Sequence, residues 1–154
     1  MSAQPSRTLS FLRSVVHMLW MLVTVIPWAI IMVVASTRVR GKPLWWMAVR
    51  WLRWATDGAR VILGVRPHVI GMENLPTGDT APAILLVKHQ STFETFFMPT
   101  LMPHPLAYVF KKELLYVPFF GWAMGRLDMI HIDRSQGSRS FRKVVAQGKE
   151  LLAQ

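Results

Sequence analysis

The sequence predicts an α/β protein that begins with a membrane helix or a helical hairpin. Two observations lead to this fold class. An uncharged apolar run near the N-terminus is long enough to cross a bilayer, and short apolar strands alternate with helical segments after residue 64. Such alternation is typical of a largely parallel sheet. We therefore expect a membrane anchor with a basic amphipathic helix over residues 1–60, and an α/β part over residues 61–154.

The composition favours a folded protein that contacts a membrane. Of the 154 residues, 52% are apolar and 17% are charged, which argues against disorder. The formal net charge is +10, of which residues 1–70 carry +8 and residues 71–154 carry +2. Because no nucleic-acid recognition motif accompanies this charge, anionic lipid is the favoured partner. The chain has no cysteine, which excludes a disulfide framework, a thiolate metal site and a cysteine nucleophile.

The apolar run Val15–Ala35 has 21 residues and carries no formal charge. A helix of about 20 residues is enough to cross the hydrocarbon core of a bilayer. Pro27 lies in the middle of the run, where it either kinks a membrane helix or marks the tip of a re-entrant hairpin. A buried core helix is the alternative to both. More cations follow the run than precede it, which places the C-terminal part in the cytoplasm by the positive-inside tendency.

Residues 38–66 interleave cations with tryptophans. One face of a helix here is apolar at helical spacing, and it comprises Leu44, Met47, Ala48, Trp51, Leu52 and Ala55. The other face carries Arg50, Arg53, Asp57 and Arg60. A basic amphipathic helix of this kind binds anionic headgroups well. The alternative is a helix packed on the protein's own core with its cations in water.

The α/β part is built in order from local apolar patterns and turn residues. The predicted strands cover residues 65–70, 83–87, 106–110 and 129–132, and loop residues fill 71–82. Helices are predicted over residues 92–101, where Pro99 favours an early end, and over 138–153. Between them, residues 111–125 are predicted to be helical in pieces that break at Pro118 and Gly121. One face of the last helix is apolar, with Phe141, Val144, Val145, Gly148, Leu151 and Leu152.

The stretch around His89 is the first candidate site. The predicted strand 83–87 delivers His89 to its carboxyl end, which is where open α/β sheets place their sites. Histidine can act as a general base near neutral pH, and Glu94 could reach back across one turn to fix its tautomer. The alternative role for Glu94 is structural, because Ser91 and Glu94 fit a capping box that holds a backbone N–H.

The stretch before Arg134 is the second candidate site. On a strand, His131 and Asp133 share one face, and Arg134 stands at the end, where it could bind a phosphate bidentately. A surface pair of Asp133 with Arg134 is the alternative, and a His131–Asp133 dyad is weaker. Ser91 lacks the G-x-S-x-G context of a nucleophile. The histidines, which are His17, His68, His89, His104 and His131, lack metal-ligand spacing.

Together the two blocks resemble the 1-acyl-sn-glycerol-3-phosphate acyltransferase (lysophosphatidic acid acyltransferase) family of bacterial membranes. The blocks are KHQSTFETFFMP and YVFKKELLYVPFFGWAMGRLDMIHIDRS. In that family a histidine is followed after four residues by an acid, usually Asp, and here these are His89 and Glu94. The second block ends in Ile132-Asp133-Arg134. The resemblance covers roughly residues 60–154 and implies a glycerolipid acyltransferase-like α/β domain at the bacterial inner membrane.

The resemblance also implies a reaction. His89 and Glu94 would be the catalytic pair, with His89 as the base for the 2-hydroxyl of lysophosphatidic acid and Glu94 orienting it. The hydroxyl would attack the thioester of acyl-CoA or acyl-carrier protein, giving phosphatidic acid. Arg134 and Lys112 would hold the phosphate, and the partners would be membrane lipids and these substrates. The resemblance implies no cofactor and no metal.

One departure from the family affects the expected activity. The family's third block, a Glu-Gly-Thr-Arg phosphate-binding sequence, does not occur before Gln154. We therefore expect an incomplete acyltransferase domain, and weak or absent turnover by these 154 residues alone. The second hypothesis is a non-catalytic, membrane-anchored module that binds anionic lipids. Acyl transfer separates the two hypotheses, whereas vesicle binding does not.

Overall fold

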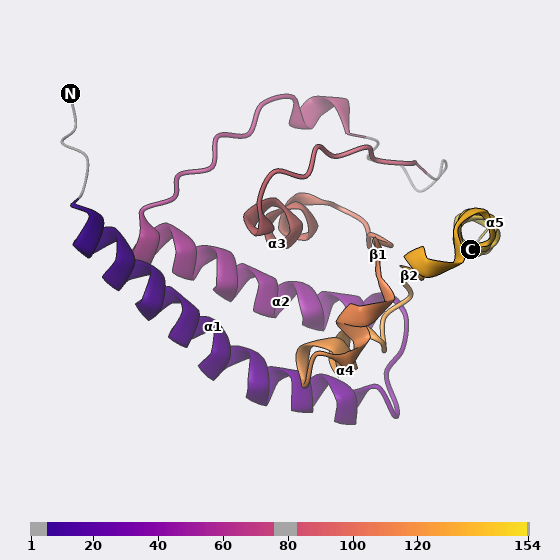
Figure 1. Ribbon diagram of the computed structural model, residues 1–154, viewed down its shortest axis with the longest axis horizontal. Helices are drawn as coiled ribbons and strands as arrows, with labels where there is room; N and C mark the ends of the chain where they lie inside the picture. Colours follow the sequence, from indigo (N-terminus) through magenta and orange to yellow (C-terminus); the bar gives the residue numbers. More distant parts are fainter. Residues whose placement is uncertain (1–5, 76–82, 154) are drawn as a thin grey trace.

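The computed structural model describes residues 6–75 and 83–153. Its α-helices are α1 (Arg7–Ala35), α2 (Lys42–Gly58), α3 (Thr92–Leu101), α4 (Phe120–Met124) and α5 (Ser138–Leu152). Its strands are β1 (Val109–Lys111) and β2 (Ile130–Ile132). The shorter helical turns are η1 (Ala59–Leu63), η2 (Met72–Asn74), η3 (Lys112–Tyr116) and η4 (Arg134–Gln136). Figure 1 shows α1 and α2 side by side as an antiparallel pair, with the remaining elements on one side of that pair.

Helix α1 is longer than the apolar run and is continuous through Pro27. It begins after Ser6, whose hydroxyl accepts a hydrogen bond from the Leu9 N–H at 3.3 Å. The predicted re-entrant tip at Pro27 is therefore wrong, because the loss of one backbone N–H does not end a 29-residue helix. The chain reverses instead after α1, at Gly41, which has a φ of +62°.

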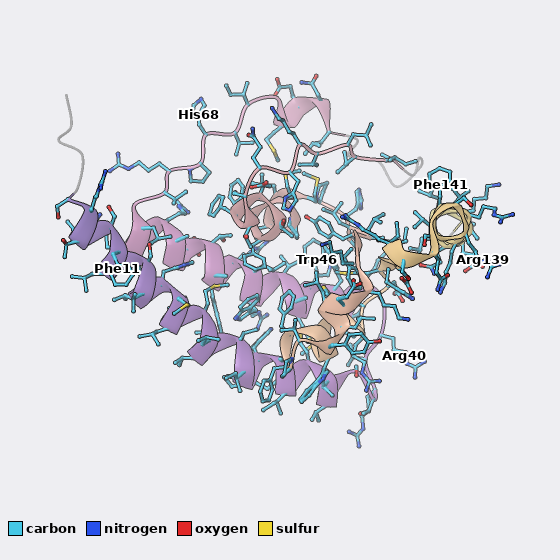
Figure 2. The ribbon with its side chains drawn as sticks, viewed as in Figure 1. Phe11, Arg40, Trp46, His68, Arg139 and Phe141 are labelled. Atoms are coloured by element: carbon cyan, nitrogen blue, oxygen red, sulfur yellow. The ribbon has the colours of Figure 1, made fainter. Side chains whose placement is uncertain are left out.

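The apolar surface of α1 is mostly exposed. Only Ala29 and Met32 of this helix are buried, so the alternative of a buried core helix is wrong. Among the described residues, α1 is the one helix long and apolar enough to cross a membrane, as judged by length and composition. Figure 2 shows Phe11 on the outer side of α1, away from α2.

Polar side chains join α1 to α2. Four contacts cross the interface, namely Trp28 Nε1 to the Met47 carbonyl (2.9 Å), Trp20 Nε1 to the Trp54 carbonyl (3.2 Å), Trp51 Nε1 to Thr24 Oγ1 (3.2 Å) and His17 Nε2 with the Ala55 carbonyl (3.3 Å). The indole N–H groups of Trp20, Trp28 and Trp51 thus each have an acceptor on the facing helix. Several of the N-terminal tryptophans therefore hold the helix pair together.

Helix α2 is amphipathic in the predicted sense. Leu44, Trp51 and Ala55 are buried, while Arg50 and Arg53 are exposed. The buried side packs on α1 and α3. The hydrophobic core next to it joins the two parts of the chain, because Ala29, Met32, Leu44 and Ala123 form one cluster. Packing on the protein's own core therefore explains the apolar face of α2, and the cations remain available to another partner.

The sheet has two parallel strands within the described residues. β1 pairs with β2 in the register Val109↔Ile130, Phe110↔His131 and Lys111↔Ile132. The predicted strands at 106–110 and 129–132 are thus confirmed in type and parallel orientation, although β1 begins three residues later and ends one residue later than predicted, and β2 begins one residue later. The crossover contains η3 and α4, which are separated by residues 117–119, so the predicted break at Pro118 is confirmed.

Gly121 does not break the helical segment. It lies inside α4, and a Cβ at this position would lie 2.3 Å from the Leu114 carbonyl oxygen. The residue is therefore glycine because α4 and η3 approach too closely for a side chain. The predicted break at Gly121 is wrong.

The two other predicted strands are not strands in this structure. Residues 65–70 and 83–87 are without secondary structure, and they pair with no other described residues. Leu86, which was predicted to lie in a buried strand, is 96% exposed. A strand requires a hydrogen-bonding neighbour as well as an apolar sequence. The apolar run at 83–87 does not specify which segment would be that neighbour.

Helix α3 has the predicted bounds and keeps Pro99 inside it. Proline has no N–H, so the carbonyl of Thr95 loses its helical donor. The Tyr108 hydroxyl donates to that carbonyl at 3.3 Å and thereby ties α3 to the approach to β1. Burial raises the pKa of Tyr108 to about 12, which keeps the hydroxyl a donor.

Helix α5 packs on β2 with one side only. Ser140 is buried, and Val144 and Gly148 are half-buried, whereas Phe141 of the predicted apolar face is exposed. Figure 2 shows Phe141 and Arg139 pointing away from the rest of the molecule. The predicted helix is confirmed, and only part of its predicted face is covered.

We expect Gly58→Ala to destabilise the helix pair. A Cβ at Gly58 would lie 2.7 Å from the Trp20 ring, so either the ring or the helix must shift. Overpacking of this kind costs about 1–3 kcal/mol in the free energy of unfolding. The matched control is Gly148→Ala in α5, where the new Cβ meets Ile130 at 3.8 Å and gains about 0.5–1 kcal/mol of helix propensity. Thermal unfolding measures both, and equal shifts in Tm would contradict the close approach.

Candidate active site

The carboxylate of Glu94 lies at the N-terminus of α3 and binds four donors. Its Oε1 accepts from His89 Nδ1 at 3.1 Å, from the Ser91 N–H at 2.5 Å and from the Gln90 N–H. Its Oε2 accepts from the Ser91 hydroxyl. Ser91 in turn caps the helix by accepting from the Phe93 N–H at 3.2 Å. One side chain therefore fixes the whole turn that leads into α3.

The two predicted roles of Glu94 are present together. The capping box is complete, and the same carboxylate contacts the imidazole of His89. This is possible because a carboxylate has several lone-pair directions and the box uses only some of them. The sequence offers the two roles as alternatives, but Glu94 holds the backbone and orients the histidine at once.

Electrostatics keep Glu94 ionised. Hydrogen bonds from the Ser91 side chain, and then from the Ser91 backbone, lower the pKa of Glu94 from its usual 4.5 to about 2. An ionised carboxylate only accepts hydrogen bonds, so His89 must donate from Nδ1, and Nε2 is unprotonated in the neutral ring. The side chain of His89 is 72% exposed and that of Glu94 is 23% exposed. The basic nitrogen therefore has room to meet a substrate.

A second polar cluster lies at the carboxyl ends of β1 and β2. Lys112 Nζ lies 3.9 Å from Asp133 Oδ2. Asp133 Oδ1 accepts from the Ser135 N–H at 3.1 Å and from the Ser135 hydroxyl at 2.5 Å, and Oδ2 accepts from Gln136 Nε2 at 3.1 Å. These bonds, those of Ser135 first, lower the pKa of Asp133. The parallel register brings Lys112 and Asp133 together, because each directly follows its strand.

This cluster corrects two predictions. The partner of Asp133 is Lys112 rather than Arg134, which is exposed at the start of η4. In the described part of the chain, no hydrogen bond joins His131 to Asp133, because Asp133 lies beyond β2 and caps η4 instead. The alternation of a strand therefore does not extend to Asp133. Sequence reasoning missed the Lys112–Asp133 pair, although the meeting of parallel strand ends could have indicated it.

The structure brings together the candidate site residues within each block but does not join the two candidate pairs directly. His89 contacts Glu94, and Lys112 contacts Asp133. No hydrogen bond or ion pair links the two pairs over residues 6–75 and 83–153. The same ranges contain no group of three or more His, Cys, Asp or Glu side chains that could hold a metal ion.

An apolar pocket of about 200 Å³ lies between the helix pair and α3. Its lining comes from four helices and comprises Met21, Leu22, Val25, Trp51, Phe96 and Phe120. Phe96 is two residues after Glu94 on α3, so the pocket and the histidine pair share one helix. The sequence does not predict this pocket, because it depends on contacts between distant segments.

An ionised carboxylate that orients an exposed imidazole is chemically able to support removal of a proton from a hydroxyl group. The sequence model of the Acyltransferase family matches residues 66–154, and the chain belongs to this family. The resemblance drawn from the two sequence blocks is thereby confirmed. No solved structure matches the chain.

Curated relatives support the same family. The 1-acyl-sn-glycerol-3-phosphate acyltransferase of Pseudomonas aeruginosa is 48% identical over 102 residues, which are 66% of this chain and 38% of that protein. The enzyme of that name in Saccharomyces cerevisiae is 36% identical over 77 residues, 50% of this chain and 24% of that protein. The alpha form of Mus musculus is 27% identical over 124 residues, 80% of this chain and 42% of that protein. The chain thus spans less than half the length of each of these relatives.

The lowered pKa of Glu94 predicts acid sensitivity of the α3 turn. Because the folded-state pKa of about 2 lies below the usual 4.5, Glu94 contributes stability that is fully present above pH 4.5. That contribution is lost as pH falls from about 4.5 to about 2. We expect Glu94→Gln to flatten the fall in Tm over this window, as measured by thermal unfolding. Glu150→Gln, at an exposed position of α5, is the control and should follow the unmodified chain. A steep fall that persists in Glu94→Gln would contradict the assignment.

Proposed function

We propose that this chain carries the acyl-transfer site of an enzyme that acylates the 2-hydroxyl of lysophosphatidic acid and yields phosphatidic acid. One observation carries the proposal: His89 donates from Nδ1 to the ionised Glu94 and leaves Nε2 exposed. The names of the curated relatives support the choice of reaction. The acyl donor is a thioester, either acyl-CoA or an acyl-carrier protein.

The proposed reaction uses His89 as base and then as acid. Nε2 takes the proton of the 2-hydroxyl while that oxygen attacks the thioester carbonyl carbon. The tetrahedral intermediate collapses, the carbon–sulfur bond breaks, and the imidazolium returns its proton to the leaving thiolate. Glu94 positions the ring and stabilises the imidazolium through the Nδ1 hydrogen bond. The products are the ester and the free thiol, so His89 ends in its initial state.

We propose that Lys112 and Arg134 bind the phosphate of the acceptor. Arg134 is exposed, and its guanidinium can bind phosphate bidentately. Lys112 is partly exposed, and its 3.9 Å ion pair with Asp133 is long enough for a phosphate to compete for the ammonium. Asp133 would then keep Lys112 near the strand ends until the substrate arrives.

The apolar pocket is the proposed site for part of the acyl chain. Its lining is apolar throughout, and Phe96 places it on the helix whose N-terminus holds His89. An acyl chain there would lie between the α/β part and the membrane helices. Burial of apolar surface in such a pocket contributes roughly 25 cal/mol per Å².

We propose that the protein lies on the cytoplasmic face of the bacterial inner membrane, with α1 in the plane of one leaflet. The side-chain contacts of α1 with α2 run along much of the length of this antiparallel pair and keep the two helices side by side. If α1 crossed the bilayer, the exposed Arg50 and Arg53 of α2 would enter hydrocarbon, at about 2.5–3.5 kcal/mol each. An in-plane helix avoids this cost and keeps the cations at headgroup level.

A second candidate function is a lipid-binding module without catalysis. The observation that favours it is the charge of +8 on residues 1–70, together with the exposed apolar surface of α1. Both candidates predict binding to anionic vesicles, and only acyl transfer separates them.

We expect His89→Ala to lower acyl transfer by about 10²–10⁴-fold, because it removes the general base. Conversion of lysophosphatidic acid is measured in single-turnover mode with acyl-CoA and with acyl-carrier protein, on the full reading frame that carries these residues. Vesicle binding should remain unchanged, since His89 lies at the turn before α3 and outside the α1–α2 pair. The control is His68→Ala, which lies outside the site. Acyl transfer that survives in His89→Ala would contradict the role of His89 as the base. If the unmodified protein shows no acyl transfer, the second candidate function is favoured.

Single cysteines test the orientation of α1, because the chain has none of its own. Ser10→Cys and Thr37→Cys place exposed thiols at the start of α1 and beyond its end. If α1 lies in one leaflet, an impermeant maleimide should label both positions in inverted membrane vesicles and neither in intact spheroplasts. Labelling of the two positions from opposite sides would contradict the in-plane arrangement and show that α1 spans the bilayer.

A further inference from the structure

A hollow of about 310 Å³ lies at the end of α2, away from the proposed acyl-transfer site. We call it the arginine notch, and its lining comprises Asp57, Arg60, Val61, Val65 and Arg66. It shares no lining residue with the apolar pocket and contains neither His89 nor Lys112.

The backbone explains how the two arginines come to line one hollow. After α2, the chain winds as the π-helical turn η1 and ends at Gly64, which has a φ of +74°. The Val65 N–H bonds back to the Ala59 carbonyl at 3.4 Å, so Arg66 returns beside the turn that carries Arg60. π-Helical turns are rare and are frequent at functional sites. The sequence Gly64-Val65-Arg66 thus builds a concave surface rather than a straight helix end.

The charges in the arginine notch favour an anion. Arg60 Nη1 lies 3.3 Å from Asp57 Oδ1, and both side chains are about 60% exposed, so this surface pair is weak. Arg66 has no hydrogen bond or ion pair with any of the described residues. Among the described residues, the notch therefore holds one guanidinium without a partner, a second that is loosely paired, and a single carboxylate. Two guanidiniums suit a phosphate group, which accepts bidentate hydrogen bonds.

The position of the arginine notch favours a membrane ligand. The turn η1 packs on α1, and Gly58 just before it packs on Trp20 of α1. Figure 1 shows this end of α2 beside the N-terminal part of α1. That part of α1 exposes Phe11 and Leu12, and Val61 of the notch itself is exposed. A lipid whose acyl chains contact α1 can therefore place its headgroup in the notch.

We propose that the arginine notch binds a phosphate group, supplied by the headgroup of an anionic lipid or by a free phosphate ester. The site is separate from the proposed acyl-transfer site and does not require catalysis. Only binding of a lipid headgroup depends on the proposed membrane location of α1, whereas binding of a free phosphate ester does not. Bound there, an anionic headgroup would hold the α1–α2 pair at a fixed depth and rotation in the leaflet.

The test compares charge-matched variants on vesicles. The protein is titrated with phosphatidylcholine vesicles that contain or lack phosphatidylglycerol, and flotation measures binding. If only general electrostatic attraction to the surface acts, the removal of one cation weakens vesicle binding about fivefold. We expect Arg66→Gln to weaken binding to phosphatidylglycerol vesicles more than tenfold, and Arg50→Gln, on the exposed side of α2, to weaken it no more than fivefold. Equal losses in the two variants would overturn the proposal.

Removal of the negative charge from the arginine notch gives an independent readout. Asp57→Asn removes the carboxylate from the arginine notch and should tighten binding to the same vesicles. Glu150→Gln changes the charge equally on α5 and is the control. A gain for Asp57→Asn above that for Glu150→Gln supports the notch, and identical gains count against it.

A measurement with a soluble phosphate ester distinguishes the two sources of phosphate. Line broadening of glycerol 3-phosphate in ³¹P NMR is measured with the unmodified protein and with Arg66→Gln in uncharged detergent. Broadening that Arg66→Gln abolishes would show that a free phosphate ester also binds, and its absence beside a selective vesicle effect would assign the site to lipid. If neither the vesicle titration nor the NMR measurement shows an effect of Arg66→Gln, the proposal is overturned. Acyl transfer and its loss in His89→Ala are measured separately, so the two proposals can fail independently.

Discussion

The rest of the site depends on the hydrogen bonds that the carboxylate of Glu94 accepts. This carboxylate gathers the Gln90 and Ser91 N–H groups, the Ser91 hydroxyl and the His89 imidazole around one charge. The donors keep the carboxylate ionised, and the ionised carboxylate keeps the donors in place. Without it, the capping box of α3 would keep only its Ser91 half, and His89 would lose the hydrogen bond that orients it. Local stability and the proposed chemistry therefore rely on the same group, so a change at position 94 affects both.

Helix α3 also connects this turn to the helices proposed to contact the membrane. Phe96 packs edge-on against Trp51, with ring centroids 5.8 Å apart and an interplanar angle of 78°. Trp51 donates to Thr24 of α1, so a chain of contacts runs from the site to the long apolar helix. The apolar pocket lies along this chain of contacts. Because α2 also holds the arginine notch at its C-terminal end, headgroup binding, acyl-chain binding and proton transfer would depend on one connected set of helices.

Local sequence patterns predicted the helices and the pairs within one turn well. The bounds of α3 follow from Ser91, Glu94 and the prolines, and His89 meets Glu94 because only five residues separate them. Contacts between distant segments were harder to predict. The apolar stretch 83–87 is exposed because strand pairing depends on a neighbour that its own residues do not identify. The Lys112–Asp133 pair and the apolar pocket depend in the same way on how β1, β2 and the helices pack.

The protonation of the two His89 ring nitrogens tests most directly whether Glu94 orients this histidine. Long-range ¹H–¹⁵N correlation spectra of the folded protein, recorded where the ring is neutral, report which nitrogen carries the proton. We expect a proton on Nδ1, held by the ionised Glu94, and no proton on Nε2. We also expect Glu94→Ala to remove this preference for Nδ1. A proton on Nε2 in the unmodified protein, or the same spectrum in Glu94→Ala, would contradict the central claim that Glu94 orients His89.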